Sequence, residues 1–266
     1  MLSTVLTKSL FEQWKALLWW ALSIVLLIAM YVAIWPSVKG QPSMADFLNQ
    51  MPEAFRSLFA AAGADMSTPV GYIQVELMSF VAPITLLLYS IGRGVSAIAG
   101  EEDAHTLELL LSSPVGRARI VVEKFAAMTI GVALLAAVTG AALVIEGALA
   151  DMGLPAQNIT AAMVHLGLLA LVFGSLSLAL SAATGRAGLS RGIPAAIAVV
   201  AYVVNGLAPV VDWLEPLQKW SPFYQYAGHD PLRNGIDPTS VLVATATCLV
   251  LVVLAAVGFR RRDTAA

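Results

Sequence analysis

The chain has 266 residues, of which 59% are hydrophobic and only 12% are charged. Soluble domains carry about twice that charged fraction, and a mean hydropathy of +0.81 excludes an ordinary water-soluble protein and indicates an integral membrane protein. The formal net charge of −2 says little, because in membranes the placement of charge matters more than its sum, and we expect no nucleic-acid partner. A single cysteine, Cys248, excludes an intrachain disulfide.

Six stretches are long and apolar enough to cross a bilayer, since about 20 residues of helix span roughly 30 Å of hydrocarbon. They cover residues 17–34, 72–95, 126–148, 161–183, 193–211 and 241–259. The sequence therefore predicts an all-α integral membrane protein, in which residues 1–266 form a single transmembrane domain.

The segment before the first span, residues 1–16, has two faces on a helical wheel. Charged side chains fall on one side and apolar ones on the other: Lys8, Glu12 and Lys15 against Leu6, Leu10, Trp14 and Leu17. This pattern predicts a helix that lies in the membrane interface and bends into the first span. The alternative is a cytosolic extension of that span.

Residues 35–71 separate the first two spans. Phe47, Met51, Phe55 and Leu58 recur there at helical spacing, which predicts a short amphipathic helix on the outer surface. In the second span, Glu76 is a candidate for a transport pathway, because ionisable groups in spans are costly. Its alternative position is the headgroup level.

Residues 100–115 interrupt the apolar pattern. Four acids, Glu101, Glu102, Asp103 and Glu108, lie close together there. Asp103 is a suitable N-cap, and the proline at position 114 prevents much continuation. Apolar residues then recur on one side of a helix: Ala104, Leu107, Leu110 and Leu111. We expect a short amphipathic helix whose apolar stripe is covered by lipid, by another part of the chain or by a partner.

Polar residues also mark the later spans. Glu146 and His165 flank a short loop, so we expect a hydrogen bond between them, which is structural; the alternative is a proton relay. Tyr202 and Asn205 in the fifth span are further pathway candidates, although an asparagine in a span usually makes a contact between helices. Residues 212–240 are rich in proline and aromatic residues, as is typical of an interfacial belt, and Asp230 and Arg233 are expected to form a pair that stabilises this loop.

The lysines and arginines predict the orientation. With both termini in the cytosol (N-in, C-in), eleven of the 15 fall on the cytosolic side. The remaining four lie outside: Lys39, Arg56, Lys219 and Arg233. An even number of spans agrees with this bias, and it places residues 100–115 in the cytosol.

The segment "GEEDAHTLELLLSSPVGRARIVVEK", residues 100–124, resembles the signature of type-2 ABC export permeases. The matching positions are Glu101, Glu102, Thr106, Leu107, Glu108, Leu109, Leu110, Pro114, Arg117 and Lys124. "WSPFYQYAGHDPLRNG", residues 220–235, is similar to the loop before the last span in that family. One departure is His105, where the family often has glycine, and it affects the turn into the helix.

The resemblance implies a membrane-spanning permease, a dimer of two copies of the chain that docks two separate ATPase subunits. It implies a cytosolic coupling helix that sits in a groove on each ATPase. The implied docking residues are Glu101, Glu102, Thr106, Leu107, Glu108, Leu110, Leu111, Pro114 and Arg117. The three bases Arg117, Arg119 and Lys124 are expected to pair with acids of the partner or with anionic lipid headgroups. The loop at 212–240 is implied to include half-helices that re-enter the outer leaflet.

No G-x-x-x-x-G-K-[S/T] phosphate loop is present in the sequence. We therefore expect no cofactor, catalytic residue or metal ligand on this chain, with ATP and magnesium held by the partner subunit. The expected function is export of a hydrophobic or amphipathic substrate across a bacterial inner membrane. Two alternatives are a membrane-embedded enzyme and an ion-coupled secondary transporter. The sequence contains neither an H-E-x-x-H nor a G-x-S-x-G motif for the former, and the span centres carry almost no charge for the latter.

Overall fold

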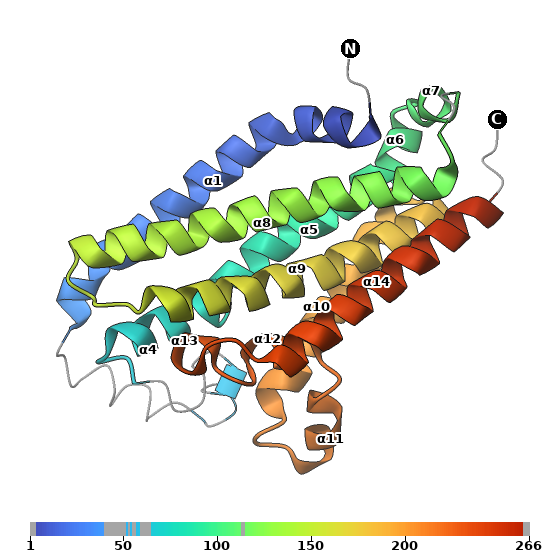
Figure 1. The fold of residues 1–266 in the computed structure, drawn as a ribbon. Helices are drawn as coiled ribbons and strands as arrows, with labels where there is room; N and C mark the ends of the chain where they lie inside the picture. The colour runs from blue at the N-terminus through green and yellow to red at the C-terminus, as the bar shows by residue number, and fades with distance from the viewer. Residues whose placement is uncertain are drawn as a thin grey trace.

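The structure is a computed structural model that describes residues 4–39, 52, 54, 57–58, 65–112 and 115–262. All regular elements in those residues are helical. The long helices run side by side along one axis (Figure 1). Both termini lie at one end of this bundle, together with α6 (Ala99–Asp103) and α7 (Leu107–Leu111). Prediction and structure therefore agree on an all-α bundle with both termini at the same end.

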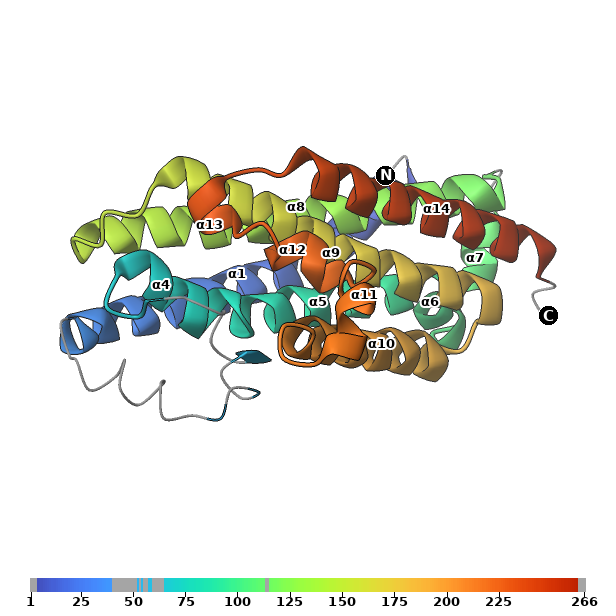
Figure 2. The same cartoon turned by 90° about the horizontal axis from the view of Figure 1, so that it is seen from below.

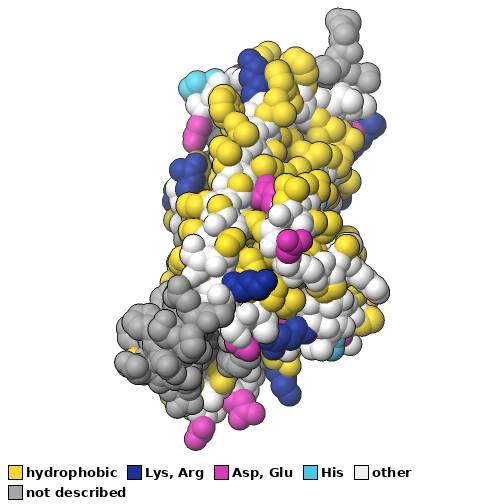
Figure 3. Space-filling model, turned by 90° about the vertical axis from the view of Figure 1, so that its left-hand side faces the viewer, with side chains coloured by type: hydrophobic (Ala, Val, Ile, Leu, Met, Phe, Trp, Pro, Cys, Tyr) yellow, Lys and Arg dark blue, Asp and Glu magenta, His cyan; other side chains and the backbone are white. Residues whose placement is uncertain are grey.

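Six helical segments of the described residues are long and apolar enough to cross a membrane. They are α1 (Val5–Val38), the composite of α4 (Pro69–Ile73), the π-helix η1 (Gln74–Met78) and α5 (Val81–Ala97), then α8 (Arg117–Leu149), α9 (Ala156–Thr184), α10 (Ala187–Leu207) and α14 (Pro238–Arg261). Each overlaps one predicted span. Much of one face is covered by hydrophobic side chains (Figure 3), as a surface in contact with lipid requires.

The α9 helix is the centre of the bundle and packs against α5, α8, α10 and α14. Its closest neighbour is α5. A Cβ atom built on Gly94 would lie 2.5 Å from the carbonyl oxygen of Gly174, so only glycine permits this approach. Ser177 and Ser181 of α9 donate hydrogen bonds to the carbonyl oxygens of Ile91 and Val95. Small residues and hydroxyl groups therefore hold these helices together, as is typical of membrane bundles.

The first helix is longer than the predicted first span. One continuous helix, α1, covers both the predicted interfacial segment and the first span. Its buried face here contains Val5, Ser9, Gln13 and Leu17 and packs against α8, whereas Trp14 is 44% exposed. The chain from Val5 onward is thus continuous with the first span, as the alternative of an extension of that span predicted, and the position of this segment in the membrane interface stays a prediction. No glycine or proline occurs near residue 16 to break the helix.

The predicted outer segments are only partly described. Most of 35–71, including Phe47, Met51 and Phe55, lies outside the described residues. The region 212–240 folds into four short helices: η2 (Asp212–Leu214), α11 (Glu215–Gln218), α12 (Pro222–Ala227) and α13 (Pro231–Asn234). In Figure 2, α11 and α12 lie midway along the bundle, whereas α4 lies closer to the end opposite α7.

The unequal lengths of the helices explain this arrangement. At 1.5 Å per residue, the 21 residues of α10 span about 32 Å, whereas the 34 residues of α1 span about 51 Å. About 30 Å crosses the hydrocarbon. The longer helices therefore extend beyond the bilayer, and α11 and α12 lie near the level where the shorter helices end.

Candidate functional site

The segment between α5 and α8 forms a tight turn at the end of the bundle that carries the termini. We call residues 99–112, which contain α6 and α7, the α6–α7 turn. The backbone N–H of Ala99 donates to Ser181 Oγ over 2.8 Å, which ties the start of the turn to α9. The turn is thus fixed to the most buried helix of the bundle.

Two short helices replace the single helix predicted over 100–115. His105 has a φ of 55°, so the backbone turns left-handed there and ends α6. Asp103 is the last residue of α6 and not an N-cap, while Thr106 precedes α7. The N–H of Thr106 donates to the carbonyl oxygen of Glu101 over 2.8 Å. A left-handed residue is usually glycine, so His105 adopts a backbone conformation that favours glycine.

The apolar stripe of the turn is covered by the chain itself. Leu107 and Leu110 are buried in a cluster with Ile98, Ile120 and Phe259. Of the three covers that the sequence allowed, the structure therefore selects another part of the chain. Burial of each leucine contributes about 2 kcal/mol, and neither side chain lies on a surface that a partner can touch.

The opposite side of the turn is open. We define the exposed face of the α6–α7 turn as Asp103, Ala104, His105, Glu108, Leu109 and Ser112. Leu109 is 72% exposed and is the large apolar group on this face. It lies within the motif but off the predicted stripe, so the helical-wheel argument did not select it. Glu108 lies on this face as a docking residue should, and Leu111 is half-buried at its edge. Pro114 lies outside the described residues.

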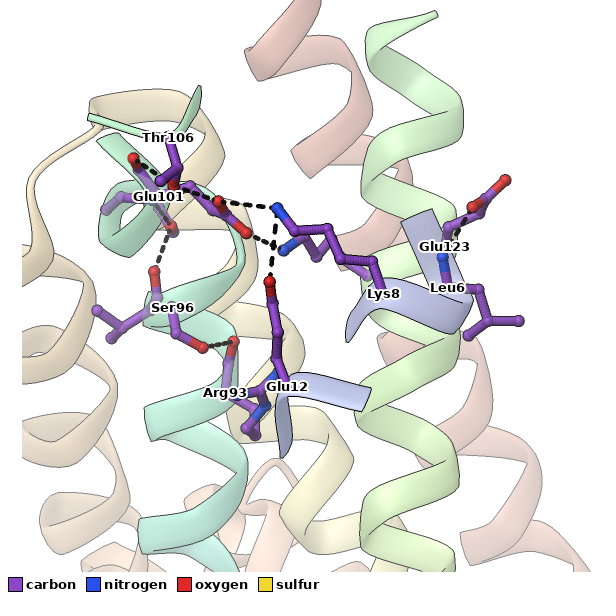
Figure 4. Close-up of polar contacts among 12 residues, drawn as sticks. Leu6, Lys8, Glu12, Arg93, Ser96, Glu101, Thr106 and Glu123 are labelled. Carbon is purple, nitrogen blue, oxygen red and sulfur yellow. Dashed lines mark hydrogen bonds and ion pairs between the residues drawn. The ribbon is translucent and has the colours of Figure 1, made fainter. Parts of the chain in front are cut away.

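Glu101 connects the turn to two long helices (Figure 4). Its carboxylate lies 2.5 Å from Lys124 Nζ of α8 and 3.7 Å from Lys8 Nζ of α1. The Thr106 hydroxyl donates to it over 2.5 Å. Both Glu101 and Lys124 are buried. Burial alone would raise the pKa of Glu101, but the hydrogen bonds from Lys124 and Thr106 outweigh it and hold the pKa below its usual value.

Glu102 and Arg117 connect the same turn to the end of α14. Glu102 pairs with Arg262. Arg117 Nη1 donates to the carbonyl oxygens of Phe259, over 3.1 Å, and of Arg262, over 2.6 Å. The Arg117 guanidinium also lies 5.5 Å from the centre of the Phe259 ring. Four predicted docking residues, Glu101, Glu102, Thr106 and Arg117, therefore make contacts within the chain that position the turn.

The three bases Arg117, Arg119 and Lys124, which were predicted to pair with a partner protein or with lipid, instead pair with groups of the same chain. Lys124 and Arg117 bind within the chain as described, and Arg119 Nε lies 2.7 Å from Glu123 Oε1. Glu123 in turn accepts a hydrogen bond from the N–H of Leu6 over 2.9 Å, at the start of α1. These contacts join α1 and α8 beside the turn.

The three pathway candidates do not form one site. Glu76 is half-buried on η1, the short π-helix, close to Tyr31 and Tyr72. Tyr202 of α10 donates to the carbonyl oxygen of Leu58 over 2.5 Å. The Asn205 carbonyl oxygen accepts from Gln218 of α11 over 3.1 Å. Tyr202 and Asn205 thus hold outer segments against α10.

The loop pairs expected near the outer end had mixed outcomes. Asp230 and Arg233 form the predicted pair, at 3.5 Å. The hydrogen bond expected between Glu146 and His165 is not formed. His165 Nε2 instead accepts from the N–H of Asp237 over 3.2 Å, so Nδ1 carries the proton and donates to the Gln225 carbonyl oxygen over 3.0 Å. Among the described residues no group of three His, Cys, Asp or Glu side chains converges to hold a metal ion.

Comparison with known protein families places this geometry in context. The family model described as "ABC-2 family transporter protein" matches residues 4–264, nearly the whole chain. A comparison with curated proteins finds no match. The match agrees with the signature in residues 100–124. It also agrees with the six apolar helical segments and with the position of both chain termini at one end of the bundle. The chain therefore belongs to the ABC-2 transporter family and is a multi-pass transmembrane permease.

Proposed function

We propose that the protein is the membrane-spanning subunit of an ATP-driven exporter, and that a separate ATPase subunit docks on the exposed face of the α6–α7 turn. ATP and magnesium are bound by that partner. Permeases of the ABC-2 family generally work with ABC ATPase subunits, and the family match covers nearly the whole chain. The single observation that carries the proposal is the α6–α7 turn, exposed on one side and anchored on the other.

The anchored side explains how a docked subunit moves the bundle. Glu101 contacts α1 and α8, Ser181 binds the start of α6, and Glu102 pairs with the end of α14. Displacement of the turn therefore displaces these four long helices and also α5, which continues directly into α6. A flexible loop without these contacts would not couple movement of the docked subunit to movement of the helices.

The exposed side has the composition of a docking surface. Leu109 supplies an apolar anchor, and Asp103 and Glu108 supply a charged rim that selects a partner with complementary bases. In this division Leu109 and Glu108 touch the partner. Leu107, Leu110 and Glu101 keep the turn in shape.

The proposal also includes the orientation in the membrane, the dimer and the class of substrate. The bias of lysine and arginine favours a cytosolic position for both termini, in the inner membrane of a bacterium. Two copies of the chain form the permease, as in the resembling family. The apolar spans favour a hydrophobic or amphipathic substrate that enters partly from the bilayer.

Affinity capture of the tagged full chain from its own membranes tests the proposal. We expect a co-purified protein that contains a G-x-x-x-x-G-K-[S/T] phosphate loop and has ATPase activity. Leu109→Asp should abolish its capture. The control is Leu149→Asp, an equally exposed leucine (82%) at the opposite end of the bundle, which should retain it. Equal capture by both variants would refute docking at this face.

A further inference from the structure

A crevice opens on the side of the bundle between α9, α12 and α14. It has a volume of about 190 Å³, which equals roughly six water molecules. Ligand sites for compact molecules measure about 300–1,000 Å³. The crevice is therefore the size of an alkyl segment and too small for a whole substrate molecule.

Its lining changes from apolar to polar along its length. Leu168, Val172, Val243 and Ala244 form one part, and the other part contains Lys219, Trp220 and Gln225. His165 lies roughly 28 Å along α9 from its end at Thr184, whereas Thr247 lies roughly 21 Å along α14 from Arg261. Because α10 spans about 32 Å, close to the roughly 30 Å of the hydrocarbon, and the segment with Lys219 and Trp220 follows its end, the polar part lies at the membrane interface and the apolar part within the acyl chains.

The polar part is held in place by hydrogen bonds across three elements. Gln225 Nε2 donates to the Lys219 carbonyl oxygen over 3.0 Å, and the Gln225 carbonyl oxygen accepts from His165. His165 in turn accepts from Asp237, just before α14. Both ring nitrogens of His165 are therefore occupied within the chain.

Lys219 is the charged residue of the lining. Its side chain is exposed and makes no ion pair with any residue that the structure describes. Beside it, Trp220 is 86% exposed, the position of an aromatic side chain at the headgroup level. A cation next to an apolar slot matches a molecule with an anionic head and an alkyl tail.

We propose that this crevice binds one anionic phospholipid of the surrounding bilayer. The phosphate lies against the Lys219 ammonium and the indole of Trp220, and the first part of one acyl chain lies between α9 and α14. The site is separate from the α6–α7 turn, at the other side of the membrane, so it does not depend on the proposed docking of an ATPase.

The test is native mass spectrometry of the full chain in detergent, titrated with dioleoyl phosphatidylglycerol or dioleoyl phosphatidylcholine. We expect the wild-type chain to retain phosphatidylglycerol in preference to phosphatidylcholine. Lys219→Gln should lower this preference by about two- to fivefold, the usual effect of one exposed ion pair. Lys39→Gln removes another exposed outer lysine, away from the crevice, and should leave the preference unchanged.

A second pair of variants tests the apolar part. Thr247 lines the crevice from α14 and is exposed, so Thr247→Trp fills the slot without disturbing the core. It should lower retention of both lipids, whereas Thr245→Trp, equally exposed but outside the lining, should not. The proposal is overturned if wild-type chain retains both lipids equally, if Lys219→Gln behaves as Lys39→Gln does, or if Thr247→Trp changes the oligomeric state but not lipid retention.

Discussion

Single residues decide the shape of the α6–α7 turn. His105 has a left-handed backbone, which costs a non-glycine residue about 1 kcal/mol or more. Its neighbours compensate, since Leu107 and Leu110 are buried and Thr106 binds Glu101. The turn therefore stores a small strain where the resembling family often avoids it with glycine.

His105→Gly should relieve this strain and raise the free energy of unfolding by about 1 kcal/mol. The measurement is thermal or denaturant unfolding of the purified chain in detergent. His229→Gly is the matched control, because His229 is also an exposed histidine in a turn but does not have a positive φ. That control should be neutral or destabilising. A gain of equal size in both variants would contradict the assignment of strain to His105.

Glu101 is the second decisive residue, because its loss leaves Lys124 buried without a counter-charge. Glu101→Gln should cost about 3 kcal/mol or more. Replacement of both partners, Glu101→Leu with Lys124→Met, should recover most of this loss. Hydrogen exchange of the amides of α7 at neutral pH measures both effects. If the double variant exchanges as fast as the single one, the pair is not the anchor of the turn.

The pKa of Glu101 sets the pH dependence of this contact. Because the folded state holds the pKa below its usual value, the stabilisation is complete above the unfolded pKa of about 4.3. It is lost as the pH falls through the lower folded value. The stability difference between the wild-type chain and Glu101→Gln should therefore narrow below about pH 4, and a constant difference would exclude this titration.

At the scale of elements, the close pair α5 and α9 provides an internal comparison. Gly94→Ala would place a Cβ atom 2.5 Å from the carbonyl oxygen of Gly174, whereas a Cβ on Gly92 meets nothing within 4 Å. Both glycines lie in α5. We expect Gly94→Ala to destabilise the chain by about 1–3 kcal/mol and Gly92→Ala to stabilise it by about 0.5–1 kcal/mol. Unfolding in detergent measures both, and equal effects would show that α5 and α9 do not pack at Gly94.

The elements also show which parts of the fold can be predicted from the sequence. The number of long helices follows from apolar runs of about 20 residues. In a membrane, the backbone N–H and C=O groups of each run must form hydrogen bonds within the run itself, which requires a helix. The break between α6 and α7 could not be predicted from residue type alone, because histidine adopts a positive φ more often than most residues but still only in a minority of cases. The buried side of α1 was also missed. It contains Ser9 and Gln13, and Gln13 is buried because it binds the Ala127 carbonyl oxygen and the Tyr89 hydroxyl.

The sequence predicted an amphipathic helical segment between the second and third spans, but not which of its faces is exposed. The motif predicts a functional role for residues 100–124, and the structure places the turn within them at an end of the bundle with one exposed face (Figure 1). A helical wheel cannot tell which side of an amphipathic helix meets its own chain. Substitution of Leu107 or Leu110 by aspartate would therefore unfold the turn by burying a charge, whereas Leu109 tests docking alone.

At the scale of the whole molecule, the position of the turn relative to the membrane remains a prediction. Charge bias favours a cytosolic position for the termini and the turn, with Trp220 on the outside. Cysteine labelling tests this directly, because Cys248 is buried and is the single native cysteine. In a Cys248→Ala background, Ser112→Cys reports on the turn, and Trp220→Cys reports on the opposite side. Both positions are exposed.

A membrane-impermeant maleimide applied to intact cells should label Trp220→Cys and leave Ser112→Cys unlabelled until the membrane is permeabilised. The expected contrast follows from the geometry, since Ser112 lies in the turn at the end of the bundle that carries the termini, whereas Trp220 lies beyond the far end of α10, which is long enough to cross the hydrocarbon once. Labelling of Ser112→Cys in intact cells would place the turn outside and exclude its docking to a cytosolic ATPase. The lipid crevice would survive that result, because its polar part would then face the inner leaflet, which also contains anionic lipid.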